Sequence, residues 1–264
     1  MELGLCVEMA FTKLPFEDRF KKAADLGFKN TEMWIVDGSY KGKPDHLAKV
    51  AEKNNVKITN TVIGSPDGSI GGGLTDPTKR NQWLERARMT IDFTKEAQIP
   101  ATIVCVGNVI EGMTDEAITE SIIEGLKPTI EIAEKAGITL LLEPLNTYYD
   151  HPGYFLTSSD RGAEICRKLN NPRLRLLFDC YHLQIMEGDL VKHIERNLDV
   201  IGHFHSAGVP GRNELYKGEI NYPFLLSQID KMGYKGSFGL EYMPTEDDET
   251  SVKKTIEHLS GAFS

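Results

Sequence analysis

The sequence lacks the long apolar runs of a membrane protein and has few positive charges. No stretch of about 18 consecutive apolar residues occurs. Near the start, Glu2 and Glu8 stand where a secretory signal would have basic and then apolar residues. We therefore expect an unexported, cytoplasmic protein with no membrane partner. Thirty Lys and Arg residues stand against 39 Asp and Glu, a formal net charge of −9. Since nucleic acids and anionic membranes bind surfaces rich in Lys and Arg, neither is an expected partner.

Cysteine is also scarce, and its spacing is uninformative. The four cysteines lie far apart and form no CxxC pair: Cys6, Cys105, Cys166 and Cys180. Neither a disulfide framework nor a cysteine metal site is therefore expected. Reduced thiols and small-molecule substrates are the simplest interpretation.

Apolar, strand-like segments alternate with amphipathic, helix-like segments along the whole chain. The expected strands cover 3–9, 30–36, 56–63, 101–106, 139–143, 174–179, 200–205 and 237–241. The expected helices cover 15–26, 44–53, 77–96, 114–137 with an interruption near Pro128, 159–169, 182–196, 223–232 and 249–262. Eight strands alternating with eight helices predict an α/β protein, a single (β/α)8 TIM barrel over residues 1–264. No linker or low-complexity tract divides it.

Four consecutive strands of the second half each end in a side chain that can bind a metal or transfer a proton. These residues are Glu143, Asp179, His205 and Glu241. Side chains alternate between faces along a strand, so all four converge on the active-site rim of the barrel if they face its interior. Three carboxylates and one imidazole suit Mg²⁺ or Mn²⁺. A helix N-cap is the alternative for any single carboxylate, and the repetition over four strands favours a site.

Several segments of the C-terminal half form a specific set of motifs. They are LEPLNT (142–147), PGYFL (152–156), DCYHLQIMEG (179–188), His205 with VPGR (209–212), GEINY (218–222) and GYKG (233–236) leading to Glu241. Together they resemble the hydroxypyruvate isomerase family of xylose isomerase-like TIM barrels. The N-terminal half agrees with this family mainly in pattern.

The resemblance implies a role for each matching residue. It implies that Glu143, Asp179, His205 and Glu241 hold the metal, and that the two glutamates also act as the acid/base pair. It implies further that His182 and Arg212 contact the substrate. The planar guanidinium of the arginine suits a substrate carboxylate, with a surface ion pair as the alternative. For the histidine, the alternative is a helix cap.

Three further residues lie near the expected site. Glu32 and Trp34 share one face of the second strand and are expected to line the mouth opposite the metal residues, with Trp34 touching the substrate. A core position is the alternative for Trp34. His203 lies one layer below His205, where a buried, hydrogen-bonded histidine is the more common structure.

The resemblance implies an isomerase that converts hydroxypyruvate to tartronate semialdehyde by proton transfer through an enediolate. Ketose 3-epimerases of the wider group, which act on ketoses such as D-tagatose, carry a glutamate at the position of Tyr149, which favours the isomerase branch. A ketose 3-epimerase and an oxo-tetronate isomerase remain open alternatives. An abasic-site endonuclease is disfavoured by the net charge, and a non-catalytic sugar-acid-binding protein is a further alternative. The expected partner is a small oxo acid or ketose, and assembly into a homo-oligomer is left open.

Overall fold

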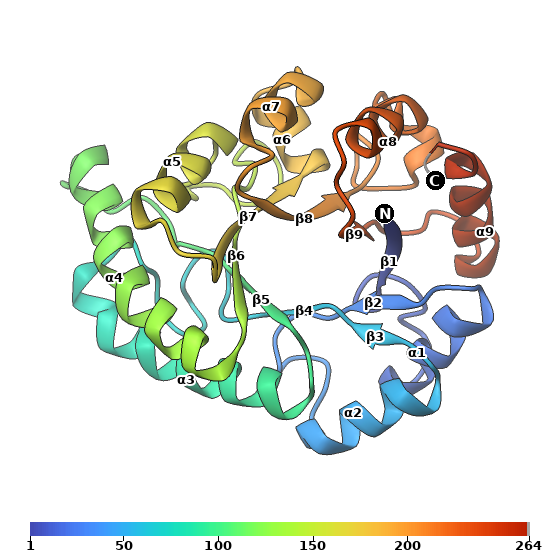
Figure 1. Cartoon of the computed structure of the whole chain (residues 1–264), viewed down its shortest axis with the longest axis horizontal. Coiled ribbons are helices and arrows are strands. Elements are labelled where there is room, and N and C mark those ends of the chain that lie inside the picture. The colour runs from blue at the N-terminus through green and yellow to red at the C-terminus, as the bar shows by residue number, and fades with distance from the viewer. Residues whose placement is uncertain (263–264) are drawn as a thin grey trace.

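A parallel sheet that curves into a barrel forms the centre of the molecule (Figure 1). The structure is a computed structural model and describes residues 1–262. The nine strands of the sheet are β1 (Glu2–Cys6), β2 (Asn30–Glu32), β3 (Lys57–Ile58), β4 (Asn60–Val62), β5 (Ala101–Val104), β6 (Thr139–Leu142), β7 (Leu174–Asp179), β8 (Ile201–Ser206) and β9 (Ser237–Leu240).

Helices surround the barrel and cover its outer face (Figure 1). They are α1 (Phe16–Asp25), α2 (Pro44–Lys53), α3 (Arg80–Glu96), α4 (Asp115–Ala136), α5 (Ser159–Leu169), α6 (Cys180–Met186), α7 (Leu190–Asn197), α8 (Tyr222–Lys231) and α9 (Asp248–Leu259), with short 3₁₀ turns η1 (Pro77–Lys79) and η2 (Leu215–Lys217). The expected TIM barrel is confirmed. Within residues 1–262, every helix is too short or too polar to cross a membrane.

The expected strand over 56–63 is divided in two, and this division closes the barrel. β3 pairs with β2, whereas β4 pairs with β5 on the opposite side of the break. The sheet order therefore begins at β3 and ends at β4, which Thr59 alone separates in the chain. A parallel bridge between Ile35, which follows β2, and Val62 of β4 closes the barrel at this point. Eight strand positions thus surround the axis, although the chain forms them with nine strands.

The break expected near Pro128 is absent, and this prediction was wrong. α4 runs without interruption from Asp115 to Ala136. A proline removes one backbone N–H, so the carbonyl of Glu124 loses its helical donor. Leu126 and Ile130 are buried on either side of the proline, and their packing against the barrel holds both halves of the helix in line.

The single helix expected over 182–196 is also wrong, because two helices cover this segment. α6 ends at Met186 and α7 begins at Leu190. Between them Gly188 has a φ of 66°, a left-handed conformation that glycine adopts without strain. The first turn of α6 consequently stays at the end of β7, at the rim of the barrel, while α7 packs on the outer layer.

The alternation of side chains along β7, β8 and β9 turns the polar strand ends inward. Phe178, Phe204 and Phe238 are aligned neighbours, with ring centroids 5.8 and 5.9 Å apart between successive strands. All three are fully buried in the outer hydrophobic layer. The residue that follows each phenylalanine therefore points into the barrel. These residues are Asp179, His205 and Gly239.

Candidate active site

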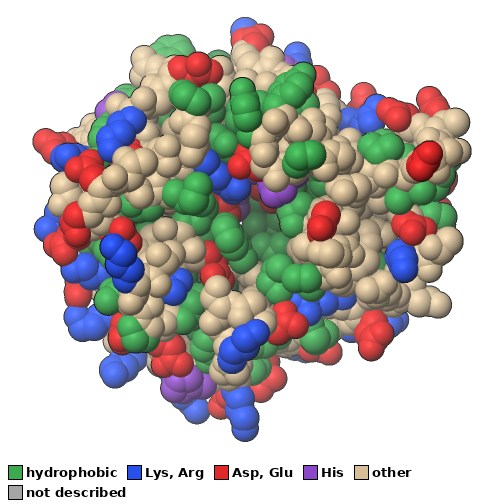
Figure 2. Space-filling model, turned by 180° about the vertical axis from the view of Figure 1, so that it is seen from behind, with side chains coloured by type: hydrophobic (Ala, Val, Ile, Leu, Met, Phe, Trp, Pro, Cys, Tyr) green, Lys and Arg blue, Asp and Glu red, His purple; other side chains and the backbone are tan. Residues whose placement is uncertain are grey.

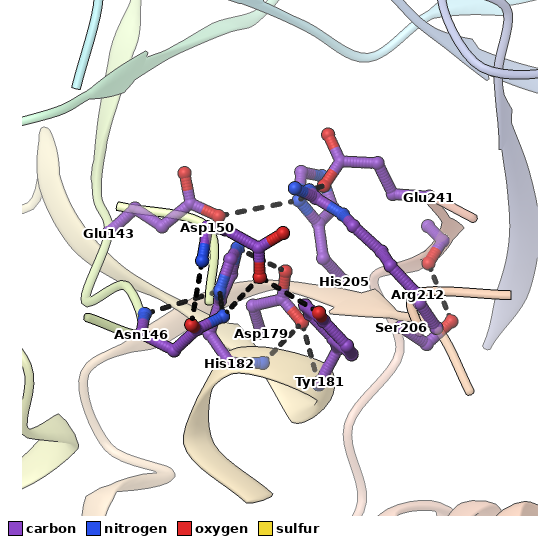
Figure 3. Close-up of polar contacts among 12 residues, drawn as sticks. Glu143, Asn146, Asp150, Asp179, Tyr181, His182, His205, Ser206, Arg212 and Glu241 are labelled. Carbon is purple, nitrogen blue, oxygen red and sulfur yellow. Dashed lines mark hydrogen bonds and ion pairs between the residues drawn. The ribbon is translucent and has the colours of Figure 1, made fainter. Parts of the chain in front are cut away.

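The structure brings the four strand-end residues together at one end of the barrel (Figure 3). Nδ1 of His205 lies 3.6 Å from Oε1 of Glu143 and 3.5 Å from Oε2 of Glu241. Ligand atoms of Asp179, His205 and Glu241 lie within 4.8 Å of one another. All four residues are buried, with at most 6% of any residue exposed. Side chains that are distant in sequence therefore form one compact polar cluster.

Burial and mutual charge shift the pKa values of this cluster in different directions. Burial raises the pKa of Glu143, and it raises that of Asp179 from 3.8 to about 7. Burial also acts to raise the pKa of Glu241, but the charges of Arg212 and His205 outweigh it and lower this pKa. Burial acts to lower the pKa of His205, yet nearby carboxylates raise it well above the usual value. The cluster concentrates acidic groups that need a positive partner.

The four residues fit a divalent metal ion. Nδ1 of His205 is buried and has no hydrogen-bond partner, although it faces the carboxylates of Glu143 and Glu241. A buried ring nitrogen without a partner normally costs free energy, and a bound cation would satisfy it in place of the proton that the carboxylates favour there. Carboxylate oxygens and one imidazole are suitable ligands for such an ion.

Asp179 also has the structural role that was the alternative to a site role, which is to cap the N-terminus of a helix. Its Oδ1 accepts hydrogen bonds from the backbone N–H of Tyr181 at 2.7 Å and, more weakly, from that of His182 at 3.4 Å. Asp179 is therefore the N-cap of α6 as well as a member of the cluster. Capping fixes the carboxylate, so the two roles support each other.

His182 is held in one tautomer by the loop after β6. Its Nδ1 accepts a hydrogen bond from the backbone N–H of Asn146 at 3.2 Å and lies 2.7 Å from the side-chain nitrogen of the same residue. A backbone N–H can only donate, so Nδ1 carries no proton and the proton of the neutral ring is on Nε2. Burial lowers the pKa of His182 well below the usual value, which keeps the ring neutral. Nε2 has no hydrogen-bond partner and lies 3.6 Å from Asp179.

Arg212 and Trp34 both contact Glu241. A terminal nitrogen of Arg212 donates to Oε2 of Glu241, and Nε1 of Trp34 donates to Oε1 at 2.7 Å. The guanidinium also lies over the ring of Tyr181, 5.5 Å from its centroid. Its side chain is only 14% exposed, so a surface ion pair does not describe Arg212.

A cavity of about 160 Å³ lies directly above the cluster. Its polar lining consists of Trp34, Glu143, His151, His182, Arg212 and Glu241. Its apolar wall includes Ile35, Val62, Ile103, Cys105 and Leu145. Asp179 and His205 are not part of the lining, because they lie deeper. Figure 2 shows a hollow at the centre of one face of the molecule, surrounded by hydrophobic side chains.

The expected position of Glu32 was wrong. Glu32 is 1% exposed and does not line the cavity. Its Oε1 accepts a hydrogen bond from Nε2 of His203 at 2.7 Å. His203 itself lies one layer below His205, as expected. Trp34 lines the cavity as expected. Tyr149 is 74% exposed and lies outside the cavity lining.

Sequence reasoning missed two residues of the site. Asn146, which orients His182, is completely buried, and His151 lines the cavity with its ring 5.4 Å from that of His182. Both belong to the loop after β6, where strand periodicity gives no information. The signal available was the cluster of polar residues directly after Glu143.

Comparisons with known proteins give a consistent result. Residues 20–261 match the family model described as xylose isomerase-like TIM barrel. A 2-oxo-tetronate isomerase of Cupriavidus necator is 45% identical over 242 residues, which cover 90% of this chain and 91% of the relative. The hydroxypyruvate isomerase of Escherichia coli is 29% identical over 251 residues, with 94% and 95% covered. A crystal structure of an AP endonuclease, family 2, from Brucella melitensis superposes with a TM-score of 0.87 at 27% identity, covering 96% of this chain and 97% of that one.

Proposed function

This chain is an isomerase of the xylose isomerase-like TIM barrel family, and we propose that it moves a proton between C2 and C3 of a short 2-oxo-3-hydroxy acid. Hydroxypyruvate and 2-oxo-tetronate share this carboxylate–carbonyl–hydroxyl arrangement, and the second has one more carbon. We place 2-oxo-tetronate first, because a relative with 45% identity carries that name, and hydroxypyruvate second.

The placement of the two glutamates carries this proposal. Glu143 and Glu241 come from non-adjacent strands, and both line the cavity, whereas Asp179 and His205 lie beneath it. Two carboxylates beside a small substrate are suited to removing a proton from one carbon and returning one to its neighbour. A cavity of about 160 Å³ is comparable in size to one that holds benzene, which favours a substrate of three or four carbons.

We propose that Glu143, Asp179, His205 and Glu241 hold Mg²⁺ or Mn²⁺. The donors are mostly hard carboxylate oxygens, and the described part of the chain places no cysteine pair beside them. When bound there, the cation supplies Lewis acidity, which makes a proton beside a polarised carbonyl easier to remove.

Arg212 and His182 are the proposed substrate-binding residues. Nε of Arg212 is buried without a partner, and the planar guanidinium suits the carboxylate of an oxo acid. The Nε2–H of His182 can donate to a substrate oxygen, because Asn146 leaves it no other tautomer. Trp34 holds Glu241 by its indole N–H and forms part of the cavity wall.

The proton transfers balance within the substrate. A carboxylate oxygen of one glutamate removes the proton from C3, and C2 receives a proton from a carboxyl group of the pair. The hydroxyl on C3 loses its proton as it becomes a carbonyl, and the former carbonyl oxygen on C2 gains one. Either glutamate can take the first step, depending on the direction of the reaction.

Deuterium incorporation tests the proposal. The Mg²⁺-loaded protein in D₂O is given 2-oxo-tetronate, hydroxypyruvate or a free ketose, and the products are followed by NMR. We expect conversion and deuterium uptake with the oxo acids, reduced at least about 100-fold in Glu143→Gln and in Glu241→Gln. Glu131→Gln, on the exposed face of α4, is the matched control and is expected to behave as the parent.

Each alternative gives a different result in this experiment. Exchange at C3 of a ketose without reaction of either oxo acid would identify a ketose 3-epimerase. Binding of an oxo acid that is unchanged by both Glu→Gln variants, with no exchange, would identify a binding protein. Abasic DNA cleavage would require a basic groove, whereas the cavity above the cluster is lined by a single basic side chain other than histidine, that of Arg212.

A further inference from the structure

A buried carboxylate with two histidines lies in the barrel interior beneath the candidate metal ligands. Glu32 comes from β2, and His203 and His205 both come from β8. Glu32, His203 and His205 are 1%, 4% and 1% exposed, respectively. An ionised carboxylate buried to this degree is costly unless its oxygens are satisfied. Its position therefore requires an explanation that the proposed reaction does not supply.

Both oxygens of Glu32 face an imidazole nitrogen. Oε1 lies 2.7 Å from Nε2 of His203, and Oε2 lies 3.0 Å from Nε2 of His205. A carboxylate therefore stands between the lower histidine and the candidate metal ligand. On the opposite side of His205, Nδ1 faces Glu143 and Glu241.

The neighbouring strands leave space for this carboxylate. Gly239 of β9 occupies an inward position level with His205. A Cβ added there would lie 2.5 Å from Oε1 of Glu32 and 2.7 Å from Cδ2 of His205. On β1, a Cβ at Gly4 would lie 3.2 Å from the same oxygen. Two strands thus carry glycine where the Glu32 carboxylate fills the interior.

The chemistry of the two groups fixes where His205 carries its proton. Oε2 of Glu32 and Nε2 of His205 lie 3.0 Å apart without the alignment of a hydrogen bond, and neither atom bonds to another group in the described part of the chain. An ionised carboxylate can only accept, so Nε2 is the nitrogen that bears hydrogen when this pair is aligned. In the neutral ring, the lone pair is then on Nδ1, which faces the carboxylates of the cluster. A metal-binding histidine needs its lone pair on that side and commonly donates its other N–H to a carboxylate.

We propose that Glu32 is a positioning residue that sets the tautomer and the orientation of His205 for metal binding, and that His203 holds Glu32 in place. This inference rests on the metal site proposed above. It assigns no contact between Glu32 and the substrate. The alternative for these three residues is a second cation site, since their ligand atoms also lie within 4.8 Å of one another.

The substitution Glu32→Gln tests the proposal. Glutamine has one acceptor oxygen, so its NH₂ group must face one of two imidazole N–H groups. We expect the dissociation constant of Mn²⁺, titrated into metal-stripped protein by calorimetry, to rise by about 10- to 100-fold. Glu214→Gln is the matched control, because Glu214 is equally buried but bonds to Thr245 and Ser251 away from the cluster. Its Mn²⁺ affinity should stay within about twofold of the parent.

NMR of the imidazole nitrogens supplies a readout that needs no variant at position 32. In Mg²⁺-loaded parent protein with ¹⁵N-labelled histidine, His205 should carry its proton on Nε2. The parent spectrum can still overturn the proposal if Glu32→Gln does not fold. A proton on Nδ1 of His205 would overturn the proposal.

Two calorimetric results would also overturn it. One is an unchanged Mn²⁺ affinity in folded Glu32→Gln, and the other is binding of two ions per chain with one lost in this variant, which would identify a second cation site. Metal affinity is measured without substrate, so its outcome is separable from the proposed reaction. A parent that binds Mn²⁺ tightly but exchanges no oxo-acid proton would contradict the function alone.

Discussion

The hydrogen bonds between Asn146 and His182 determine what the histidine can do in the cavity. The backbone N–H of Asn146 fixes the tautomer, and its side-chain amide lies 2.7 Å from the same ring nitrogen. The amide also donates to Asp150 at 2.6 Å, and Asp150 accepts from the hydroxyl of Tyr181. The side chain of Asn146 thus orients the ring, and the backbone N–H by itself is enough to set the tautomer.

Replacing Asn146 by Ala should therefore lower activity without changing the tautomer of His182. The ring loses its side-chain support and shifts, and a small misplacement of a substrate-binding group costs up to about 100-fold in kcat/KM. Steady-state kinetics with 2-oxo-tetronate would measure the loss. Asn171→Ala, at an exposed contact with Glu134, is the control and should leave kinetics unchanged. Parent-like kcat/KM in Asn146→Ala would show that the backbone contact is sufficient.

Asp179 provides a second prediction at the residue scale. Its buried position suits a metal ligand, but burial of the ionised carboxylate lowers the stability of the folded protein. Burial raises its pKa from 3.8 to about 7 in the metal-free protein. Below pH 3.8 the carboxyl is protonated in both the folded and the unfolded chain. As pH rises toward 7, the unfolded chain loses the proton first, so folding becomes less favourable. The penalty is complete above about pH 7.

Asp179→Asn should therefore stabilise the metal-free protein, and more at pH 8 than at pH 5. Asparagine can still cap α6, since its side-chain oxygen accepts the same backbone N–H groups. The extra gain is roughly 2 kcal/mol, or about 4–8 °C in Tm for a chain of this size. Thermal unfolding in chelator at both pH values measures it.

Asp247→Asn is the control for this pH effect. Asp247 caps α9 in solvent, and its hydrogen bond from the backbone of Thr250 lowers its pKa. Because this pKa lies below the ordinary value, Asp247 is ionised at both pH values, and the substitution should destabilise the protein by the same amount at pH 5 and at pH 8. A Tm difference for Asp179→Asn that does not vary with pH would refute the argument.

At the scale of the strand, the sequence contained enough information to predict the convergence of the cluster. The two-residue period of a strand is local, so Glu143, Asp179, His205 and Glu241 could be assigned to one face from their own neighbours. Glu32 could not be placed in depth from its own strand. Whether an inward side chain lies at the mouth or beneath it depends on the register between strands and on the small size of Gly4 and Gly239 opposite.

Loops and helix interiors account for the other differences. The contact between Asn146 and His182 joins the loop after β6 to the first turn of α6, and no periodicity relates the two. The division of the expected strand at Thr59 follows from closure of the barrel, which is a property of the whole sheet. Pro128 was expected to interrupt a helix because local propensity was weighed without tertiary packing, which overrides it here.

The uninterrupted α4 gives a prediction at the scale of the helix. Pro128→Ala restores a backbone N–H for the carbonyl of Glu124 and removes the ring from the helix interior. We expect stabilisation of about 1–3 kcal/mol with unchanged kinetics. Thr114→Ala, at the N-cap of the same helix, should instead cost about 1 kcal/mol. Denaturant unfolding measures both, and lower stability of Pro128→Ala would show that the proline ring contributes packing that outweighs the lost hydrogen bond.

At the scale of the whole molecule, the net charge of −9 opposes the proposed substrate, which is an anion. Long-range repulsion slows the approach of a carboxylate from solution, whereas Arg212 attracts it only at short range inside the cavity. Salt screens charges that are separated by more than about 8–10 Å and affects buried pairs much less. Added salt should therefore weaken the repulsion more than it weakens the contact with Arg212.

The kcat/KM for 2-oxo-tetronate should consequently rise, by roughly twofold, as ionic strength increases from 0.01 to about 0.15 M at constant Mg²⁺. A neutral ketose, if it reacts at all, should show no such rise, which makes it the control for salt effects on the protein itself. Stopped-flow or initial-rate measurements at low substrate concentration report kcat/KM directly. A fall in kcat/KM with salt would mean that the positive groups of the site, the bound cation and Arg212, attract the substrate from beyond the cavity mouth and dominate the field of the whole chain.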